Sequence, residues 1–95
     1  MSRFVFTRKA ELDLEKISDY IGEHNLKAAN NLLEQFDEAF KILAESPKIG
    51  HPRSDLTKLK VRFWPVGSYL IIYKETDPLE IIRVLSGLRN LVEIL

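Results

Sequence analysis

The most constraining feature of the sequence is a pair of amphipathic helical patterns separated by a break of only a few residues. In the first pattern the apolar side chains recur at spacings of three and four, at Ala10, Leu14, Ile17 and Ile21. In the second they keep helical spacing, at Ala29, Leu32, Leu33, Phe36, Ala39, Phe40 and Leu43. This period is typical of helices that bury one face. Because a short connection makes neighbouring helices antiparallel, the sequence predicts a helical hairpin.

Both expected helices have a capping residue in front of them. Thr7 precedes the first pattern and Asn25 the second, and the side-chain oxygen of either residue can accept a hydrogen bond from a free N–H group of the first turn. Gly22 lies at the end of the first pattern, and Pro47 stops the second because proline cannot continue a helix. The helices are therefore expected between Thr7 and Gly22 and between Asn25 and Pro47.

The hydrophobic pattern changes after Pro47. A loop with proline and glycine extends to about Leu59, and three apolar runs follow at residues 61–65, 69–73 and 79–85. Short turns separate these runs, as in tight antiparallel hairpins. The middle run is almost continuously apolar, so both of its faces are expected to be shielded from water.

The expected architecture is a single α+β domain over residues 1–95. Its order is β-α-α-β-β-β, beginning with a short strand at residues 4–6, and the helical hairpin covers one face of an antiparallel sheet. A last apolar stripe with helical spacing predicts a short C-terminal helix, at Leu88, Leu91, Val92 and Leu95. This stripe either caps the core or binds a partner helix, and the core is the favoured location.

Composition excludes several classes of protein. The 14 Lys and Arg balance the 14 Asp and Glu, so the usual signature of a nucleic-acid-binding domain is missing and no sequence-specific nucleic-acid binding is expected. No apolar run is long enough to cross a membrane. The chain has no cysteine for a disulfide or for a cysteine-containing metal site. We expect a cytoplasmic protein that uses no metal and no cofactor.

Positive charge is densest between His51 and Arg62. The basic residues of this segment are Arg53, Lys58, Lys60 and Arg62, with Asp55 as the single acid. The segment is either the contact site of an acidic partner or an ordinary solvated loop. The solvated loop is the more common case for a patch of this size.

Strand alternation suggests a further contact surface on the sheet. Alternate residues of a strand point to opposite faces, so Arg62 and Trp64 share one face of their strand. If the helices cover the other face, Arg62 and Arg83 project from the uncovered face near Trp64, and Arg and Trp are frequent binding hot spots. The structural alternative is an ion pair between Arg83 and an acid of its own hairpin, Glu75 or Glu80.

Few residues could carry catalysis. His24 and His51 have no partner at the spacing of a metal site, and Ser86 lacks the glycine-flanked elbow of a nucleophilic serine. Tyr69 and Tyr73 lie on one face of the expected central strand, where they are acid–base groups, stacking platforms or, most commonly, part of the core. No catalytic residue and no metal ligand is therefore assigned.

Several motifs occur together in an order that points to a known family. They are Thr7-x-x-Ala10-x-x-Asp13-Leu14-x-x-Ile17-x-x-Tyr20-Ile21, Ala28-Ala29, Leu43-x-x-x-Pro47-x-x-Gly50-x-x-Arg53, Val61-Arg62, Tyr69-Leu70-Ile71-Ile72-Tyr73 and Ile82-Arg83-Val84-Leu85-Ser86-Gly87-Leu88-Arg89-Asn90. With these motifs the chain resembles the ParE branch of the RelE/ParE superfamily of type II toxins over nearly its whole length. The resemblance implies a small toxin that a cognate antitoxin, ParD-like and of the ribbon-helix-helix type, neutralises.

The resemblance also bears on the mode of action, because ParE-like toxins are known as inhibitors of DNA gyrase whereas RelE-like toxins cut mRNA in the ribosome. Arg62 and Arg83 match positions of the RelE-like basic set, but Ser86 stands where that motif often has histidine, and no C-terminal tyrosine is present. Asn90 stands where ParE-like chains often have aspartate. Arginine stays protonated and serves poorly as a general base. We therefore expect a gyrase inhibitor without enzymatic activity; the alternatives are a RelE-like ribosome-dependent mRNA interferase and an attenuated, non-toxic member.

The expected contact surface combines the basic segment with residues of the expected strands and the C-terminal segment. Its partner is DNA gyrase, the complex of gyrase with DNA, or an acidic segment of the antitoxin. The residues assigned to it are Arg53, Lys58, Lys60, Arg62, Trp64, Arg83 and Arg89.

Overall fold

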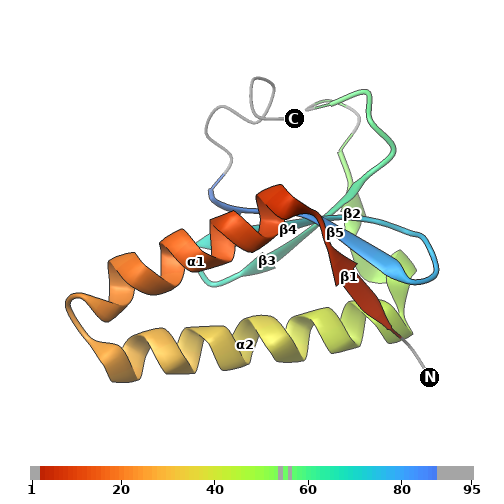
Figure 1. Cartoon of the computed structure of the whole chain (residues 1–95). Coiled ribbons are helices and arrows are strands. Elements are labelled where there is room, and N and C mark those ends of the chain that lie inside the picture. The colour runs from red at the N-terminus through yellow and green to blue at the C-terminus, as the bar shows by residue number, and fades with distance from the viewer. Residues whose placement is uncertain (1–2, 54, 56, 88–95) are drawn as a thin grey trace.

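The fold is a helical hairpin packed on a five-stranded sheet (Figure 1). The computed structural model describes residues 3–53, 55 and 57–87. Its elements are β1 (Phe4–Phe6), α1 (Arg8–Gly22), α2 (Leu26–Glu45), the 3-10 turn η1 (Pro47–Ile49), β2 (His51–Pro52), β3 (Arg62–Val66), β4 (Tyr69–Lys74) and β5 (Leu79–Ser86). The expected α+β class is confirmed, and the expected strands and helices follow in the expected order, with η1 and β2 as additions between α2 and β3. The expected C-terminal helix lies outside the described residues.

The capping residues of the helical hairpin act as the sequence predicts. The hydroxyl of Thr7 accepts a hydrogen bond from the backbone N–H of Ala10 at 3.1 Å, and the side-chain oxygen of Asn25 accepts one from Ala28 at 3.0 Å. Both interactions satisfy donors that the first helical turn leaves free. Neither α1 nor α2 combines the length and the apolar character that crossing a membrane requires.

The sheet is mixed, with the strand order β1-β5-β4-β3-β2. Antiparallel pairing joins β3 to β4 and β4 to β5, as the two hairpins predict. It also joins β2 to β3, a pairing that the apolar runs did not predict. The edge strand β1 instead runs parallel to β5, and Leu79 donates a backbone hydrogen bond to Arg3 at 3.0 Å. The expectation of a wholly antiparallel sheet is therefore wrong at this edge. A short apolar pattern carries no information on direction, which depends on contacts with residues far along the chain.

The two helices cover the face of the sheet that carries Ile71, Tyr73 and Ile81. These side chains form one core with α2, which contributes Phe36, Phe40 and Leu43 among others. The other face carries a second cluster, formed by Val61, Phe63 and Ile72. Because Ile71 and Ile72 are both fully buried, the expectation that both faces of β4 are shielded is confirmed.

Trp64 packs against the helix-side core, so the helices cover the face of Trp64 and not that of Val61 and Phe63. Arg62 and Arg83 were expected to project from the uncovered face only if the helices covered the face of Val61 and Phe63, and the helices do not cover that face. Both faces of β3 and β4 are apolar, and the pattern alone could not show which face meets the helices. Arg62 also lies on the covered face. Its charged group is not buried in the core, because the long side chain reaches the backbone carbonyls of Lys48 and Gly50.

The hydroxyl of Tyr73 joins β4 to the turn that follows α2. It donates a hydrogen bond to the carbonyl of Pro47 at 2.6 Å and accepts one from the backbone N–H of Gly50 at 2.9 Å. The side chain of Tyr73 is fully buried, and a Cβ atom at position 50 would collide with its hydroxyl. Gly50 is therefore required by this close approach and not by a special backbone angle.

Replacing Tyr73 with phenylalanine should lower the free energy of unfolding by about 1–3 kcal/mol, because the buried N–H of Gly50 loses its acceptor. Urea denaturation measures the change. Tyr69→Phe is the matched control on the same strand, because the Tyr69 hydroxyl makes no hydrogen bond to the described residues. Equal loss in both variants would contradict the role assigned to the Tyr73 hydroxyl.

The same variant should change how stability depends on pH. Burial raises the pKa of Tyr73 above its ordinary value, so the unfolded chain releases this proton at a lower pH than the folded chain does. The free energy of unfolding should then fall as the pH rises above about 10, and this component should be absent in Tyr73→Phe. Urea denaturation of both proteins across the alkaline range tests the prediction; parallel pH profiles would refute it.

Candidate contact surface

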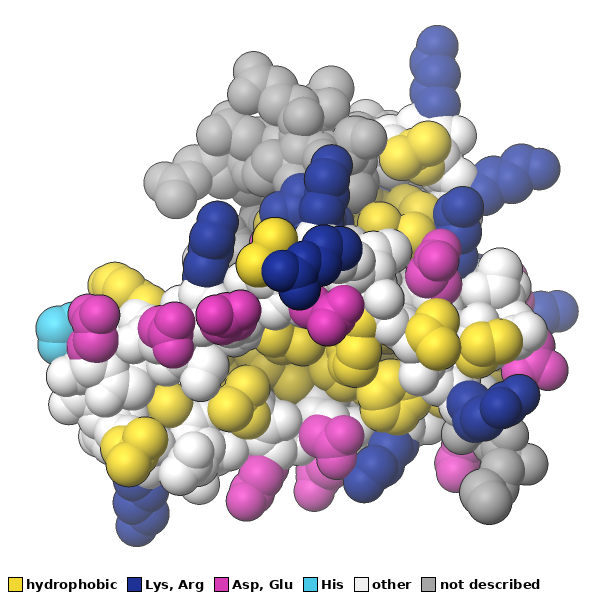
Figure 2. All heavy atoms as spheres, in the orientation of Figure 1, with side chains coloured by type: hydrophobic (Ala, Val, Ile, Leu, Met, Phe, Trp, Pro, Cys, Tyr) yellow, Lys and Arg dark blue, Asp and Glu magenta, His cyan; other side chains and the backbone are white. Residues whose placement is uncertain are grey.

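A groove rich in cationic side chains lies between β2, the segment that precedes β3, and the end of β4. We call it the cationic groove; its volume is about 470 Å³, and its lining residues are Pro52, Arg53, Thr57, Lys58, Leu59, Lys60, Val61, Arg62 and Glu75. Arg53, Lys58, Lys60 and Arg62 were assigned to the contact surface from the sequence, and the fold brings all four together here. Figure 2 shows lysine and arginine side chains gathered in the upper right of the view, where Figure 1 places this segment.

The guanidinium of Arg53 is held by a neighbouring acid. Its Nε and Nη2 atoms donate hydrogen bonds to the two carboxylate oxygens of Asp55 at 3.0 and 2.9 Å. These hydrogen bonds raise the pKa of Arg53 and lower the pKa of Asp55. The pair is exposed to solvent, so it orients the guanidinium without contributing much stability.

Arg62 is fixed in place by the turn before β2. Its Nη1 atom donates hydrogen bonds to the carbonyls of Gly50 at 2.8 Å and of Lys48 at 3.2 Å. Its Nε atom lies 3.5 Å from a carboxylate oxygen of Glu75. The side chain of Arg62 is therefore held against one wall of the cationic groove, with the Glu75 carboxylate beside its guanidinium.

Lys58 and Lys60 differ from these arginines. Both side chains are exposed, and neither forms an ion pair with an acid among the described residues. Leu59 lies between them in the sequence and is 51% exposed. Two free cations flanking an apolar side chain are suited to a partner that is acidic and partly apolar.

Arg83 lies elsewhere, in contact with α1. Its Nε and Nη2 atoms donate hydrogen bonds to the Asp13 carboxylate at 2.7 and 2.8 Å, and that carboxylate also accepts the backbone N–H of Val84 at 3.0 Å. The Asp13 and Arg83 side chains are only 11% and 17% exposed. These hydrogen bonds raise the pKa of Arg83. The expectation that Arg83 projects beside Arg62 is wrong, and so is the alternative pairing with Glu75 or Glu80.

A local irregularity of the sheet accounts for part of this difference. The pairing of β4 with β5 changes register between Ile72 and Tyr73, so simple alternation does not hold along β5. Asp13 lies on α1, and as a charged residue it would ordinarily face the solvent. It follows Ala10 by three residues and precedes Ile17 by four, which places it beside the buried stripe and could have identified it.

Trp64 is only half buried and has an unexpected neighbour in His51. Their rings are stacked, with centroids 6.3 Å apart and planes 14° from parallel. The pairing of β2 with β3 creates this contact, and no apolar run predicted β2, which spans only His51–Pro52. Tyr69 belongs to the core periphery, where its ring meets Phe36 edge to face. Arg89, the last of the assigned residues, lies outside the described residues.

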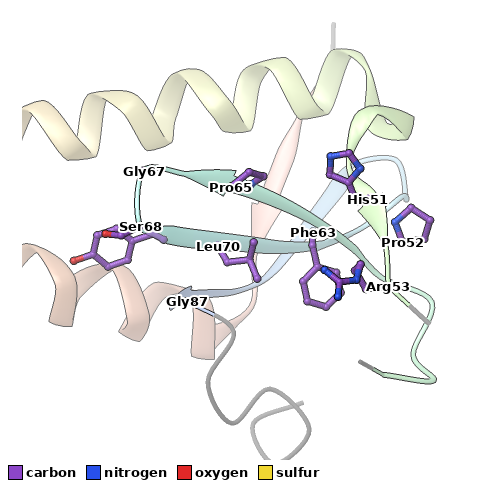
Figure 3. A pocket seen from close by; sticks show the side chains of 10 residues that line it. His51, Pro52, Arg53, Phe63, Pro65, Gly67, Ser68, Leu70 and Gly87 are labelled. Carbon is purple, nitrogen blue, oxygen red and sulfur yellow. The ribbon is translucent and has the colours of Figure 1, made fainter. Parts of the chain in front are cut away.

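A second groove adjoins the first. We call it the apolar groove; its volume is about 610 Å³, and its lining residues are His51, Pro52, Arg53, Phe63, Pro65, Gly67, Ser68, Tyr69, Leu70 and Gly87 (Figure 3). Sequence reasoning did not identify this groove, although Phe63 and Leu70 are apolar residues of two adjacent runs. No group of three or more metal-ligating side chains occurs in the described part of the chain. The two grooves together offer hydrogen-bond donors, positive charge and apolar surface to a partner.

Comparisons with known proteins agree on one family. Residues 4–91 match the family model described as the ParE toxin of the type II toxin–antitoxin system parDE. The chain is 30% identical over 93 residues to Toxin ParE3 of Caulobacter vibrioides, with 96% of this chain and 92% of that protein covered. A solved structure described as the chromosomal ParDE TA system from P. aeruginosa has a TM-score of 0.74 and 21% identity, with 92% of this chain and 97% of that chain covered.

The Asp13–Arg83 pair should be important for stability. Arg83→Met and Asp13→Asn should each lower the free energy of unfolding by about 2–3 kcal/mol, because either change leaves a largely buried polar group without its partner. The double variant should show a coupling of at least about 1 kcal/mol. Lys41→Met, which removes the exposed pair with Asp37, is the control and should leave stability nearly unchanged. Additive effects of the two changes would show that the pair does not act as a unit.

Proposed function

Because the chain belongs to the ParE toxin family of type II toxin–antitoxin systems, we propose that it stops growth by inhibiting DNA gyrase through direct contact. Until the toxin is freed, it is bound by a cognate antitoxin, which we propose to be ParD-like and of the ribbon-helix-helix type. Both partners place the protein in the cytoplasm.

The observation that carries this proposal is the cationic groove on a rigid support. Arg62 is held by the carbonyls of Gly50 and Lys48, while Lys58 and Lys60 present free charge to solvent. A surface with fixed walls and exposed cations binds another macromolecule without first having to order itself. Gyrase, alone or with its DNA, is the target that this family assignment favours.

A non-enzymatic mode of action is supported by the side chains that line the cationic groove. Cleavage of RNA needs a group that accepts the proton of the 2′-hydroxyl and a second group that protonates the leaving oxygen. Arginine and lysine are protonated near neutral pH and serve poorly as bases. Glu75, the one acid among the described lining residues, is paired with Arg62. Contact is therefore the better-supported role for these residues.

One observation favours the alternative of RNA cleavage. His51 is an exposed imidazole stacked on Trp64 at the rim of the apolar groove. A histidine can transfer protons near neutral pH, and aromatic rings stack on unpaired bases. A ribosome-dependent interferase is thus the second candidate, and the experiment below separates it from gyrase inhibition.

Reversing the charge of Lys58 and Lys60 should reduce toxicity. The purified chain is expected to inhibit supercoiling by gyrase and to accumulate cleaved DNA. The double variant Lys58→Glu/Lys60→Glu should need on the order of tenfold more protein for the same inhibition, because opposed charges weaken contact and slow association. Lys16→Glu/Lys27→Glu carries the same charge change on the helical hairpin and should inhibit like the unmodified chain.

Two outcomes would contradict gyrase inhibition in different ways. Codon-positioned cuts in ribosome-bound mRNA, together with normal supercoiling, would identify an interferase, and His51→Ala should then abolish the cuts. Normal growth at confirmed soluble levels of the unmodified chain would identify an attenuated member of the family.

A further inference from the structure

One side of α1 faces the solvent from its first turn to its last. Its exposed residues recur at spacings of three and four, so they lie on one face of the helix. We call this face the outer face; it comprises the exposed residues between Arg8 and Glu23. In Figure 2 acidic side chains run along α1 toward the turn before α2, and cationic ones lie nearer its start. The two ends of the outer face therefore differ in charge.

Two large apolar side chains of the outer face are exposed. Leu12 is 37% and Tyr20 67% exposed, and their separation of eight residues corresponds to about 12 Å along the helix. The Tyr20 ring meets the ring of His24 edge to face, with centroids 5.8 Å apart, and this contact favours one orientation of the tyrosine. Tyrosines are frequent binding hot spots, and one that is already oriented loses little side-chain freedom on contact.

The charges at the two ends of the outer face oppose the dipole of α1. Arg8 and Lys9 begin the helix, with Glu11 as the acid of the first turn. Asp19 lies in the last turn, which has no base, and Glu23 follows the helix directly. A helix is stabilised by the reverse arrangement, with acids at its start and bases at its end. None of these side chains forms an ion pair with another described residue. A partner of matching charge would compensate both ends.

We propose that the outer face binds the outer face of a second copy of this chain, with the two α1 helices antiparallel. The twofold axis passes near Lys16, so that Leu12 packs on the partner's Tyr20 and Lys16 lies beside the partner's Glu15. The cationic start of each helix then lies along the acidic end of the other. A parallel pair would instead set like charges against each other, which is unfavourable. Because the same face is used by both copies, the assembly closes as a dimer.

A shallow groove at the acidic end suits the cations of the second copy. Its volume is about 430 Å³, and its described lining residues are Ser18, Asp19, Gly22, Glu23 and Leu26. None of these residues is basic, two are acids, and Leu26 is 69% exposed. Arginine and lysine side chains combine an apolar stem with a charged end. The partner's Arg8 and Lys9 can therefore cover the leucine with their stems while their charges meet the two carboxylates.

The proposed dimer leaves the cationic groove uncovered. The Asp13–Arg83 pair joins α1 to β5, whereas the cationic groove lies beside β2 and β3, toward the other edge of the sheet. The dimer would therefore carry two cationic grooves, one from each copy. One helix from each copy, about 22 Å long, makes a small interface, so we expect a weak dimer whose population grows with concentration.

Sedimentation velocity of the full chain, purified without any partner, tests the proposal. We expect a monomer–dimer equilibrium between about 1 µM and about 1 mM that shifts toward the monomer as salt increases. Arg8→Glu/Lys9→Glu and Asp19→Lys/Glu23→Lys should each raise the dissociation constant at least about tenfold, because each sets like charges opposite each other. Both changes suit the helix dipole, so both variants should melt no lower than the unmodified chain.

Mixing these two variants is the decisive measurement. The first has acids at both ends of the outer face and the second has cations at both ends, so neither pairs well with itself. An equimolar mixture should restore dimers, because each end then meets its opposite. Glu34→Lys/Glu38→Lys makes the same kind of charge change on exposed positions of α2 and should dimerise like the unmodified chain.

A single introduced cysteine tests the position of the axis, since the chain has no cysteine of its own. Lys16→Cys should form disulfide-linked dimers under mild oxidation, because the two copies of this position meet near the axis. Lys41→Cys, at an exposed position of α2, should stay monomeric.

Several results would overturn the proposal. A chain that stays monomeric up to about 1 mM would leave the outer face to a different partner, such as the antitoxin. A dimer that survives both charge reversals would use another surface. An equimolar mixture that does not associate would refute the pairing of opposite ends, and equal cross-linking of the two cysteine variants would refute the axis near Lys16.

Discussion

The buried hydroxyl of Tyr73 determines where the walls of both grooves stand. It binds the carbonyl of Pro47 and the N–H of Gly50, and so fixes the turn between α2 and β2 against the centre of the sheet. That turn in turn presents the carbonyls of Lys48 and Gly50 to Arg62. The position of β2 beside β3 depends on these hydrogen bonds, because a two-residue strand has few contacts of its own. Pro52 and Arg53 line both grooves, so the shape of both grooves depends on these hydrogen bonds as well.

A second polar contact joins α1 to β5 and gives Arg83, an expected contact residue, a role within the fold. Asp13 satisfies the backbone N–H of Val84 and both donors of Arg83, and so joins α1 to β5. Arg83 and Arg62 were both expected at a contact surface, yet both are engaged by groups of this chain. Among the cations that line the cationic groove, Lys58 and Lys60 are the ones without an ion pair to an acid of the described residues. A motif position therefore identifies a residue but not its role, which depends on what surrounds the side chain.

The sequence was sufficient to predict the two helices and the antiparallel strands β3, β4 and β5. Thr7 and Asn25 mark the helix starts, Pro47 marks the end of the hairpin, and the apolar runs mark β3, β4 and β5. It could not show that β1 is parallel, because three residues have no directional signal. Nor could alternation place Arg83, since the register shift near Ile72 breaks the period of two. The cationic residues could be predicted because they are close in sequence. The apolar groove could not, because its lining residues come together only when β2, β3 and β4 pair.

The net charge of zero does not prevent the cationic groove from attracting an acidic partner. Acidic side chains exceed basic ones in residues 1–48 (9 against 7), and the reverse holds in residues 49–95 (5 against 7). In Figure 2 a row of acidic side chains follows α1, away from the lysines and arginines at the upper right. The molecule extends over 36 Å along its longest axis, whereas salt screens exposed charges beyond about 8 Å at physiological ionic strength. A partner near Lys58 and Lys60 therefore experiences the local cations, and the balancing acids of α1 contribute little to its binding.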